Sequence, residues 1–326
     1  MMSSRASIWA KARRQPALLA LWILAAVFIA YVFVTGGYLT TVLQFAAIYA
    51  IFVTGLNIFM GYAGQVSFGH NAFAAISGYT SAVLTANYGW ATLPAGAVGL
   101  ASALACALVV GYPTLRLRGH YLAMATLAIG LIVYEVTVQW GSVTQGYMGI
   151  SGIPPLGVGR WSVTSDRAVL ACLIVLAALA VLAAAAIRHS RLGRALVAIA
   201  GSEEAARALG IEVARYKLIA FLISAFYAAL AGSLFVHAVG FVSPEVYGLH
   251  MVVLAFTMLY VGGIGTVAGA ALGALVVALL PETIRTLSDY QDLAYGAALI
   301  LILIYAPGGL ASVPRFWSSR HGQERA

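Results

Sequence analysis

Charged residues are scarce in this chain of 326 residues, where they make up 9% against 62% hydrophobic residues. A soluble domain carries roughly 25% charged residues. This shortage, together with a mean hydropathy of +0.95, excludes an ordinary soluble protein. The lysines are Lys11 and Lys217, and neither lies in the Gly-rich loop with Gly-Lys-Ser/Thr that cradles nucleotide phosphates. ATP hydrolysis linked to this protein therefore has to come from another chain.

Cysteine is also rare, and both cysteines, Cys106 and Cys172, lie within apolar runs. In such surroundings a cysteine behaves as a small hydrophobic residue. His237 and His250 are too far apart for a His-x3-His pair and have no cysteine nearby, so no metal site is predicted. No convergent nucleophile and base are apparent in the apolar runs either. The sequence therefore predicts neither an enzyme nor a cofactor held by this chain.

Long apolar runs make up most of the chain. Ten of them approach or exceed the length of about 20 residues that crosses a bilayer. They cover residues 17–34, 39–60, 70–86, 92–113, 120–140, 168–187, 216–236, 247–262, 266–281 and 290–306. We therefore predict an all-α polytopic membrane protein with about ten transmembrane helices, folded as a single transmembrane domain over 1–326.

The net charge of +8 follows this arrangement of spans. With the N-terminus in the cytoplasm, all lysines and arginines except Arg160, Arg167 and Arg285 fall on the cytoplasmic side, in agreement with the positive-inside rule. The basic excess is thus a topology signal rather than a sign of nucleic acid binding, and both termini are expected inside. The first run is longer than the ~7–15 apolar residues of a signal peptide, so we expect it to be retained.

Ten spans divide into two sets of five. If the two sets are repeats, the second must be inverted in the membrane relative to the first, because each contains an odd number of spans. Inverted repeats are a common transporter architecture. Two Gly- and Ser-bearing breaks, GYAGQVSFGHN (61–71) and GFVSPEVYG (240–248), give this arrangement weak support. The outside loop at about 141–167 is long for a compact protein, and such loops are usually functional or disordered.

One dense island of charge lies in the cytoplasmic segment at about 190–214. It has the signals of a short helix: a capping serine, two acids that suit the positive end of the helix dipole, an arginine four residues after the first acid and a terminal glycine. These residues are Ser202, Glu203, Glu204, Arg207 and Gly210. On composition alone, a solvated loop helix explains them equally well.

The island also resembles a family motif. Glu204, Ala205 and Ala206, followed after three residues by Gly210, are similar to the Glu-Ala-Ala-x3-Gly motif of ABC-importer permeases. The flanking stretches resemble, in order over about residues 40–310, the LivM-type permease of branched-chain amino acid importers. They include GLNIFMGYAGQVSFGHNAFAAISGYTSAVL (55–84), LRLRGHYLAMATLAIGLIV (115–133), GISGIPP (149–155), RYKLIAFLISAFYAALAGSLF (215–235) and VGGIGTVAGAALGALVVALLPE (261–282).

This resemblance implies a permease subunit of an ATP-driven importer in a bacterial cytoplasmic membrane, for branched-chain or related hydrophobic amino acids. It implies that the short helix docks into a groove on a cytoplasmic ATPase and transmits its closure. The implied partners are a second, LivH-like permease subunit, two ATPase subunits that bind the ATP, an extracytoplasmic solute-binding protein and membrane lipid.

The identity of the solute stays open at this point. Similar permeases also handle urea, short amides and aromatic acids. This chain moreover has Gln145-Gly146-Tyr147-Met148-Gly149 where the family pattern leads us to expect Gly-Gly-Pro-Asn-Gly. That departure leaves the expected fold unchanged but bears on the choice of ligand.

Polar residues beside glycines are candidates for the translocation path. Broken backbone at membrane depth is tolerated only where protein or a water-filled cavity surrounds it. The candidates are Gln65, Ser67, His70 and Asn71 in the first break, with Thr144 and Gln145 near the outer mouth. The alternative is an ordinary cytoplasmic turn between two helices.

Glu135 is a carboxylate placed inside a predicted span, and an intramembrane acid is a functional candidate. It lies near the outer end of its helix, where snorkelling or a structural hydrogen bond competes with that role. A proton-coupled carrier usually has several buried acids. An ion-coupled secondary carrier is therefore the runner-up, and the ATP-driven importer is favoured because it alone explains the charged island.

Overall fold

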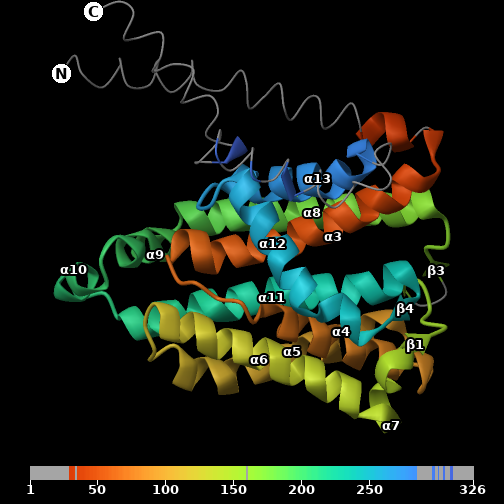
Figure 1. Ribbon diagram of the computed structural model, residues 1–326, viewed down its shortest axis with the longest axis horizontal. Helices are drawn as coiled ribbons and strands as arrows, with labels where there is room; N and C mark the ends of the chain where they lie inside the picture. Colours follow the sequence, from red (N-terminus) through yellow and green to blue (C-terminus); the bar gives the residue numbers. More distant parts are fainter. Residues whose placement is uncertain are drawn as a thin grey trace, which may run out of the picture.

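The computed structural model describes residues 29–33, 35–158 and 161–284, with isolated positions at 296, 297, 300, 304, 309 and 310. This part of the chain is a bundle of long helices that run side by side (Figure 1). The predicted last span (290–306), and the predicted first span up to residue 28, lie outside the described residues.

Eight of the ten predicted spans correspond to helices in the described part of the chain. They are α3 (Tyr38–Asn57), extended by the π-helical turn η1 (Ile58–Tyr62), then α4 (His70–Ala86), α5 (Thr92–Thr114), α6 (His120–Gln139), α8 (Asp166–His189), α11 (Val213–Val239), α12 (Leu249–Gly262) and α13 (Val267–Ile284). Five segments are long and apolar enough to cross a membrane: Tyr38–Tyr62, α5, α6, α8 and α11. The all-α polytopic class is therefore confirmed.

The short elements gather at the two ends of the bundle (Figure 1). At one end lie α9 (Arg191–Gly201) and α10 (Glu203–Ala208). At the other end the loop after α6 is built from α7 (Gly141–Thr144), the 3-10 turn η2 (Gly146–Met148), β1 (Ile150–Ser151), β2 (Gly157–Val158) and β3 (Trp161–Ser162). The predicted outside loop is thus an ordered structure that begins with a helical turn.

A small ladder ties this loop to the second break. β1 pairs antiparallel with β4 (Phe241–Val242), so that Ile150 lies opposite Val242, while β2 pairs with β3. The turn η3 (Pro244–Tyr247) follows β4 and leads into α12. Ile150 and Val242 are both buried, so the ladder closes the end of the bundle over its apolar core.

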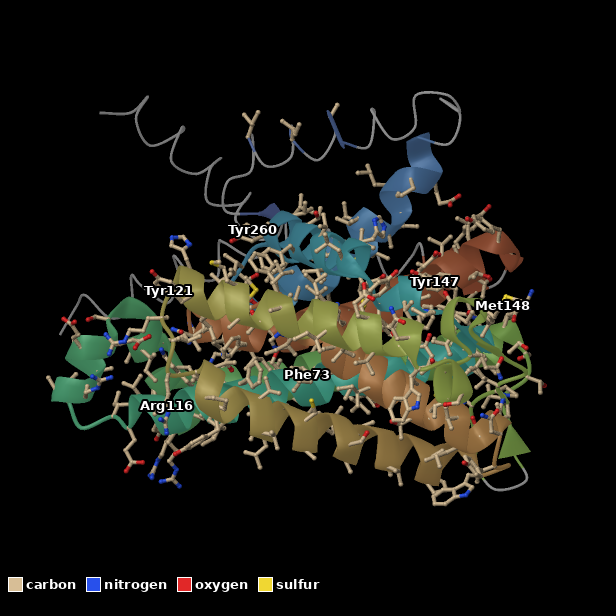
Figure 2. The ribbon with its side chains drawn as sticks, turned by 60° about the horizontal axis from the view of Figure 1, so that its bottom comes forward. Phe73, Arg116, Tyr121, Tyr147, Met148 and Tyr260 are labelled. Carbon is tan, nitrogen blue, oxygen red and sulfur yellow. The ribbon has the colours of Figure 1, made fainter. Side chains whose placement is uncertain are left out.

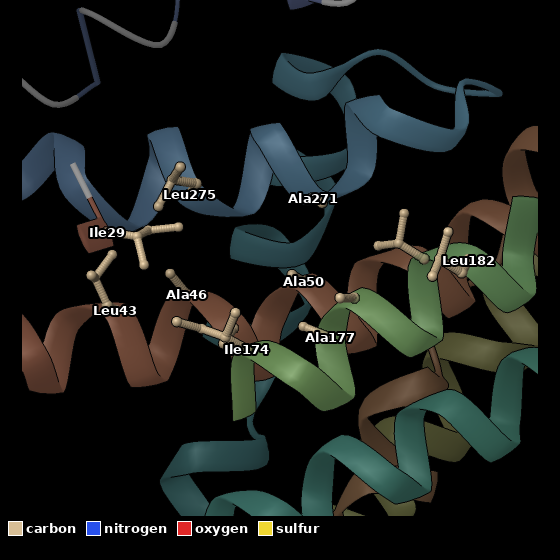
Figure 3. Close-up of a pocket in the computed structure, with 12 residues that line it drawn as sticks. Ile29, Leu43, Ala46, Ala50, Ile174, Ala177, Leu182, Ala271 and Leu275 are labelled. Carbon is tan, nitrogen blue, oxygen red and sulfur yellow. The ribbon is translucent and has the colours of Figure 1, made fainter. Parts of the chain in front are cut away.

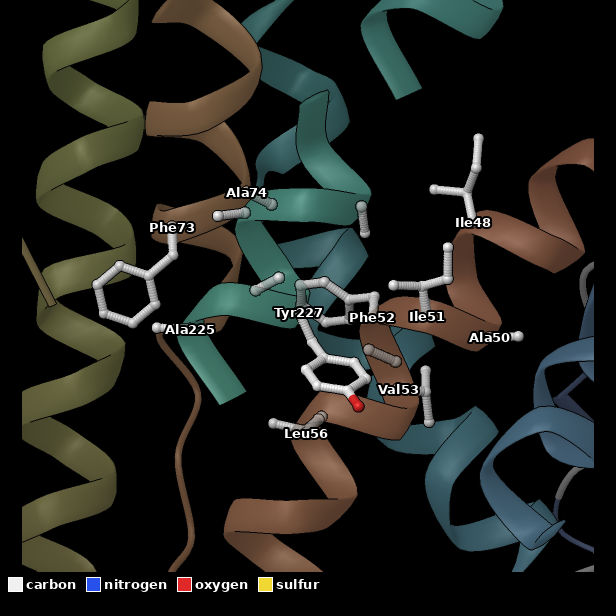
Figure 4. Packing of buried hydrophobic residues seen from close by; sticks show 14 of the residues in the cluster. Ile48, Ala50, Ile51, Phe52, Val53, Leu56, Phe73, Ala74, Ala225 and Tyr227 are labelled. Carbon is white, nitrogen blue, oxygen red and sulfur yellow. The ribbon is translucent and has the colours of Figure 1, made fainter. Parts of the chain in front are cut away.

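Small residues let the central helices approach closely. A Cβ on Gly55 of α3 would overlap the Tyr227 side chain of α11, and one on Gly232 of α11 would overlap the backbone of Ala74 in α4. Figure 4 shows Tyr227 lying against α3 next to Leu56, and its hydroxyl donates a 2.9 Å hydrogen bond to the Ala180 carbonyl of α8. Without a hydrophobic force between helices in lipid, such close packing supplies much of the association.

The helix contacts follow a reciprocal pattern. α3 and α11 pack against each other, α11 packs against α5 as α3 packs against α13, and α4 pairs with α5 as α12 pairs with α13. Each short helix, α4 or α12, follows a long helix after a break in the backbone. Two inverted five-helix halves would give this pattern, with α3 and α11 as equivalent central helices.

Candidate coupling and translocation sites

The short helix expected in the charged island is present as α10. Ser202 caps it, because its hydroxyl accepts a 3.2 Å hydrogen bond from the Ala205 N–H. Gly210 follows the helix with a φ of +81°, a conformation that favours glycine. Buried Ala206 packs with Ile199 of α9 and Val213 of α11. This apolar contact holds α10 against the end of the bundle.

Glu203 does not form the expected pair with Arg207. Its carboxylate turns inward and forms an ion pair with Lys217 of α11, while Oε2 lies 3.9 Å from Arg118 Nε. Lys217 is only 2% exposed. A buried ammonium needs a paired acid far more than an exposed arginine does, which explains why the carboxylate leaves its own helix.

The same carboxylate also reaches the first break. Gln65 Nε2 donates a 3.2 Å hydrogen bond to Glu203 Oε1 and another to the Ala63 carbonyl. Partial burial acts to raise the pKa of the Glu203 carboxyl, but the hydrogen bond and charge of Lys217, followed by Gln65 and Arg118, hold this pKa below its ordinary value. Glu203 therefore stays ionised and joins α10, α11 and the break.

A basic cavity of about 570 Å³ surrounds this junction, at the end of the bundle where Figure 2 shows Arg116. Its charged lining consists of Arg116, Arg118, Arg207, Arg215, Lys217 and the single acid Glu203. Arg116 lies 4.8 Å over the Tyr112 ring. Cations outnumber the acid, so this end of the molecule presents positive charge to any partner or lipid headgroup.

The break from residue 63 to residue 69 runs back into the bundle instead of turning outside it. Gly64, with a φ of +66°, lies against Ala200 of α9, and the Phe68 N–H donates a 3.0 Å hydrogen bond to Thr126 Oγ1 of α6. A Cβ on Gly69 would overlap the Thr126 carbonyl. Helix α4 consequently starts beside the interior of α6 rather than at its end.

The four candidates in this break are all buried, but they take different places. Gln65 joins Glu203. Ser67 Oγ lies 2.9 Å from His70 Nδ1, and the His70 ring packs among the rings of Phe59, Phe73 and Phe221 with centroids 5.5–5.8 Å away. Asn71 Nδ2 donates a 2.8 Å hydrogen bond to the Tyr247 carbonyl. The structure therefore does not gather the four side chains around one open space.

The two outer candidates also differ. Thr144 is buried, with its hydroxyl 2.7 Å from the Thr137 carbonyl at the end of α6, and it holds α7 in place. Gln145 is exposed and has a φ of +61°. It precedes Tyr147 and Met148, which also project from this end of the bundle (Figure 2).

Glu135 is exposed on the C-terminal half of α6 rather than buried inside the chain. It lies in a shallow groove with Leu131, Ile132, Val136 and Gln139. The side of α6 that turns away from the bundle carries Ile132, Val136 and Gln139 as well as Glu135, which is the physical reason that the acid has no buried partner among the described residues. Leu131 lies at the edge of this side and also lines a second cavity, next to Gly130.

Two further cavities differ in chemistry. One of about 420 Å³ lies between α3, α8 and α13 and is lined by aliphatic side chains alone (Figure 3). It offers no hydrogen bond to a charged solute. The other, of about 300 Å³, is lined by Asn71, Tyr134, Glu245 and His250 as well as by apolar residues. Asn71, one of the predicted path residues, lines this second cavity.

Several residues of these sites were missed by sequence reasoning. Lys217 carried a signal, since it is one of two lysines and stands just inside a predicted span. Glu245 follows Pro244 in the second break. A polar residue between two predicted spans is readily explained as an exposed loop residue, so it did not stand out as a site candidate. Gly130 had no signal at all, because glycine is abundant in this chain, with 34 residues.

Comparison with known proteins agrees with the sequence resemblance. The family model described as branched-chain amino acid transport system / permease component matches residues 38–306. The high-affinity branched-chain amino acid transport system permease protein LivM of Salmonella typhimurium is 35% identical over 82% of this chain and 68% of the relative. LivM of Escherichia coli is 33% identical over 91% and 75%.

A second kind of permease is also similar. The LivH permease protein of the Escherichia coli high-affinity branched-chain amino acid transport system is 30% identical over 82% of this chain and 92% of the relative. No solved structure matches the chain. With a family match that spans most of its helices and relatives that agree in kind, the chain belongs to the family of permease components of branched-chain amino acid transport systems.

Proposed function

We propose that this chain moves branched-chain or related hydrophobic amino acids across the bacterial cytoplasmic membrane, with both termini in the cytoplasm. In this proposal a LivH-like permease is its membrane partner, a binding protein delivers the solute, and two ATPase subunits bind the ATP, so the chain itself carries no cofactor. The names of its relatives support the solute. Similarity to both LivM and LivH supports a paired permease.

The proposed contact with the ATPase is α10. Its outward residues, including Glu204, Ala205 and Arg207, are exposed, and Leu209 directly after it is 80% exposed. A leucine this exposed, beyond the ends of the long apolar helices, is suited to a pocket on a partner protein. The surrounding arginines would add electrostatic steering toward an acidic surface.

The observation that carries the proposal is the position of Glu203. It stands in the first turn of α10, yet its carboxylate bonds to Lys217 of α11 and to Gln65 of the break. A displacement of α10 by a closing ATPase would therefore pull on a central helix and on the segment that leads into α4. A surface helix without such bonds could move without effect on the bundle.

The direct test is reconstitution of the full complex in liposomes, with leucine uptake measured with and without ATP. ATP-dependent uptake is expected. Its failure in a complex that assembles and hydrolyses ATP would contradict the proposed solute.

The proposed contact is tested by Leu209→Asp. This variant should reduce co-purification of the ATPase with the permease at least several-fold, because a charge would enter an apolar pocket. Met148→Asp is the matched control, since Met148 is equally exposed at the opposite end of the bundle. Full retention of the ATPase by the Leu209 variant would contradict the assignment of α10.

A further inference from the structure

The 300 Å³ cavity lies where the two backbone breaks meet. It is bounded by the start of α4, the middle of α6 and the segment from η3 to the first turn of α12. Gly130, one of its lining residues, lies about 15 Å along α6 from His120 at a rise of ~1.5 Å per residue, which is halfway along this helix. Transporters commonly bind their solutes at mid-depth, where discontinuous helices end.

Asn71 leaves one polar atom unused in this cavity. The side chain is 3% exposed, and its amide nitrogen is taken by the Tyr247 carbonyl. Its Oδ1 is buried and has no hydrogen-bond partner among the described residues. A Cβ on Gly130 would come within 2.7 Å of this oxygen, so the glycine allows the Asn71 side chain to lie against α6. A buried acceptor without a donor is unfavourable.

Further acceptors lie along the same wall. Glu245 of η3 lines the cavity and forms no ion pair within the part of the chain that the structure describes. Tyr134 of α6 lines it as well, with its ring beside Gly248. An amide oxygen, a carboxylate and a phenol oxygen together suit a group with several N–H donors and a positive charge.

The remaining walls suit the other parts of an amino acid. Leu249 and His250 form the first turn of α12, a helix of 14 residues. The Met251 N–H donates to the Gly248 carbonyl. The first two N–H groups of a helix have no partner inside it and lie at its positive end, which favours a carboxylate. Leu127, Leu131 and Val252 supply an apolar wall.

We propose that this cavity is a transient site for a hydrophobic α-amino acid during its passage. The ammonium group lies against Asn71 Oδ1 and Glu245, the carboxylate at the first turn of α12, and the side chain against Leu127, Leu131 and Val252. The assignment rests on the proposed function and adds a defined place for the solute. The cavity volume is at the lower end of the ~300–1,000 Å³ typical of ligand pockets, which suits a solute of this size.

The proposal distinguishes between the solutes that similar permeases handle. Urea and short amides have neither an ammonium nor a carboxylate group, so they would leave Glu245 and the first turn of α12 unpaired. A carboxylic acid without an amine would place its charge near Glu245 with no cation between them. A site built to hydrogen-bond a polar group of its solute discriminates strongly against analogues that lack this group.

The transport test uses the reconstituted complex with leucine as the probe. Glu245→Gln and Asn71→Leu are expected to lower ATP-dependent leucine uptake at least tenfold, while ATP hydrolysis stimulated by the loaded binding protein continues. Glu135→Gln is the matched control, because Glu135 is an exposed acid on the same half of α6 but does not line this cavity. It should transport at the wild-type rate.

A second measurement does not depend on turnover. Leu131→Cys, in a background where Cys106 and Cys172 are replaced by alanine, should react with a maleimide at the cavity wall. Millimolar leucine should slow this labelling in the assembled complex, and Glu245→Gln should abolish the protection. Neither urea nor 4-methylpentanoate, which has the carboxylate but no amine, should protect.

The outcomes separate the two levels of the proposal. If the wild-type complex hydrolyses ATP but does not transport leucine, the proposed function fails. If it transports leucine while both cavity variants keep the wild-type rate, the cavity assignment fails and the function stands. Absence of labelling in the Leu131→Cys variant, or equal protection by urea, would also overturn the assignment.

Discussion

Glu203 and Lys217 depend on each other because Lys217 is buried. Removal of one member of a buried pair leaves an uncompensated charge, which costs about 3–5 kcal/mol. We expect the loss of stability in Glu203→Gln to lie at or below the lower end of this range, because the Glu203 side chain is 20% exposed and glutamine can still accept a hydrogen bond. Thermal unfolding of the purified permease measures the loss. Glu204→Gln, on the exposed side of the same turn, should change the unfolding midpoint very little.

The pH dependence of this pair has a defined sign. A carboxyl whose pKa is lower in the folded state stabilises the fold above its unfolded pKa of about 4.3, and the stabilisation is lost as the pH falls through the folded value. The difference in unfolding free energy between wild type and Glu203→Gln should therefore be constant from pH 6 to pH 8. It should shrink only below the ordinary range of glutamate. A difference that already declines between pH 7 and pH 6 would contradict the pairing.

At the scale of single elements, Gly210 tests whether the end of α10 matters. Nothing lies within 4 Å of a Cβ built there, so only its φ of +81° opposes a side chain. A β-branched residue in this conformation costs about 1–2 kcal/mol. Gly210→Val should therefore fold and insert but lose most of the ATP hydrolysis that the loaded binding protein stimulates.

The control for this change is Gly201→Val. Gly201 ends α9 in equally open space but has no positive φ. Stimulated ATP hydrolysis should be close to the wild-type rate in this variant. Equal loss in both variants would show that a bulky residue anywhere in the segment is harmful.

The elements differ in how far the sequence could predict them. Helices α5, α6 and α8 follow from apolar runs, and α10 follows from Ser202, its two acids and Gly210. The course of residues 63–69 could not be predicted, because it depends on contacts with Thr126 and Ala200 that are distant along the chain. The same holds for the partner of Glu203. The i,i+4 spacing rule predicts Arg207 as the partner. In the fold, however, Glu203 pairs with Lys217, which is buried and therefore needs an acid more than Arg207 does.

At the scale of the whole molecule, the two ends of the bundle have different functions in the proposal. The cap residue of α8, Ser165, is exposed at the end that holds the strands, and Ser202 is exposed at the end that holds α10. In intact cells, a cysteine at 165 should react with a membrane-impermeant maleimide and a cysteine at 202 should not. Labelling of both from the same side would contradict the orientation inferred from the basic residues.

The mid-depth cavity belongs to this largest scale, and that is why the sequence could not predict it. Asn71, Gly130 and Glu245 come from three separate segments, and no periodicity or spacing relates them. Their proximity follows from the packing of α4 and α6 against η3, which brings the break before α4 against the break before α12. Pattern analysis could identify each break but not that they meet.

The ladder between β1 and β4 has a consequence for how the protein is made. Synthesis proceeds from the N-terminus, so Ile150 is made well before its partner Val242 exists. The loop after α6 therefore waits without its closing strand until α11 has crossed. A ribosome that stalls before residue 242 would leave a half-made chain in which Ile150 has no strand partner and this end of the bundle stays open.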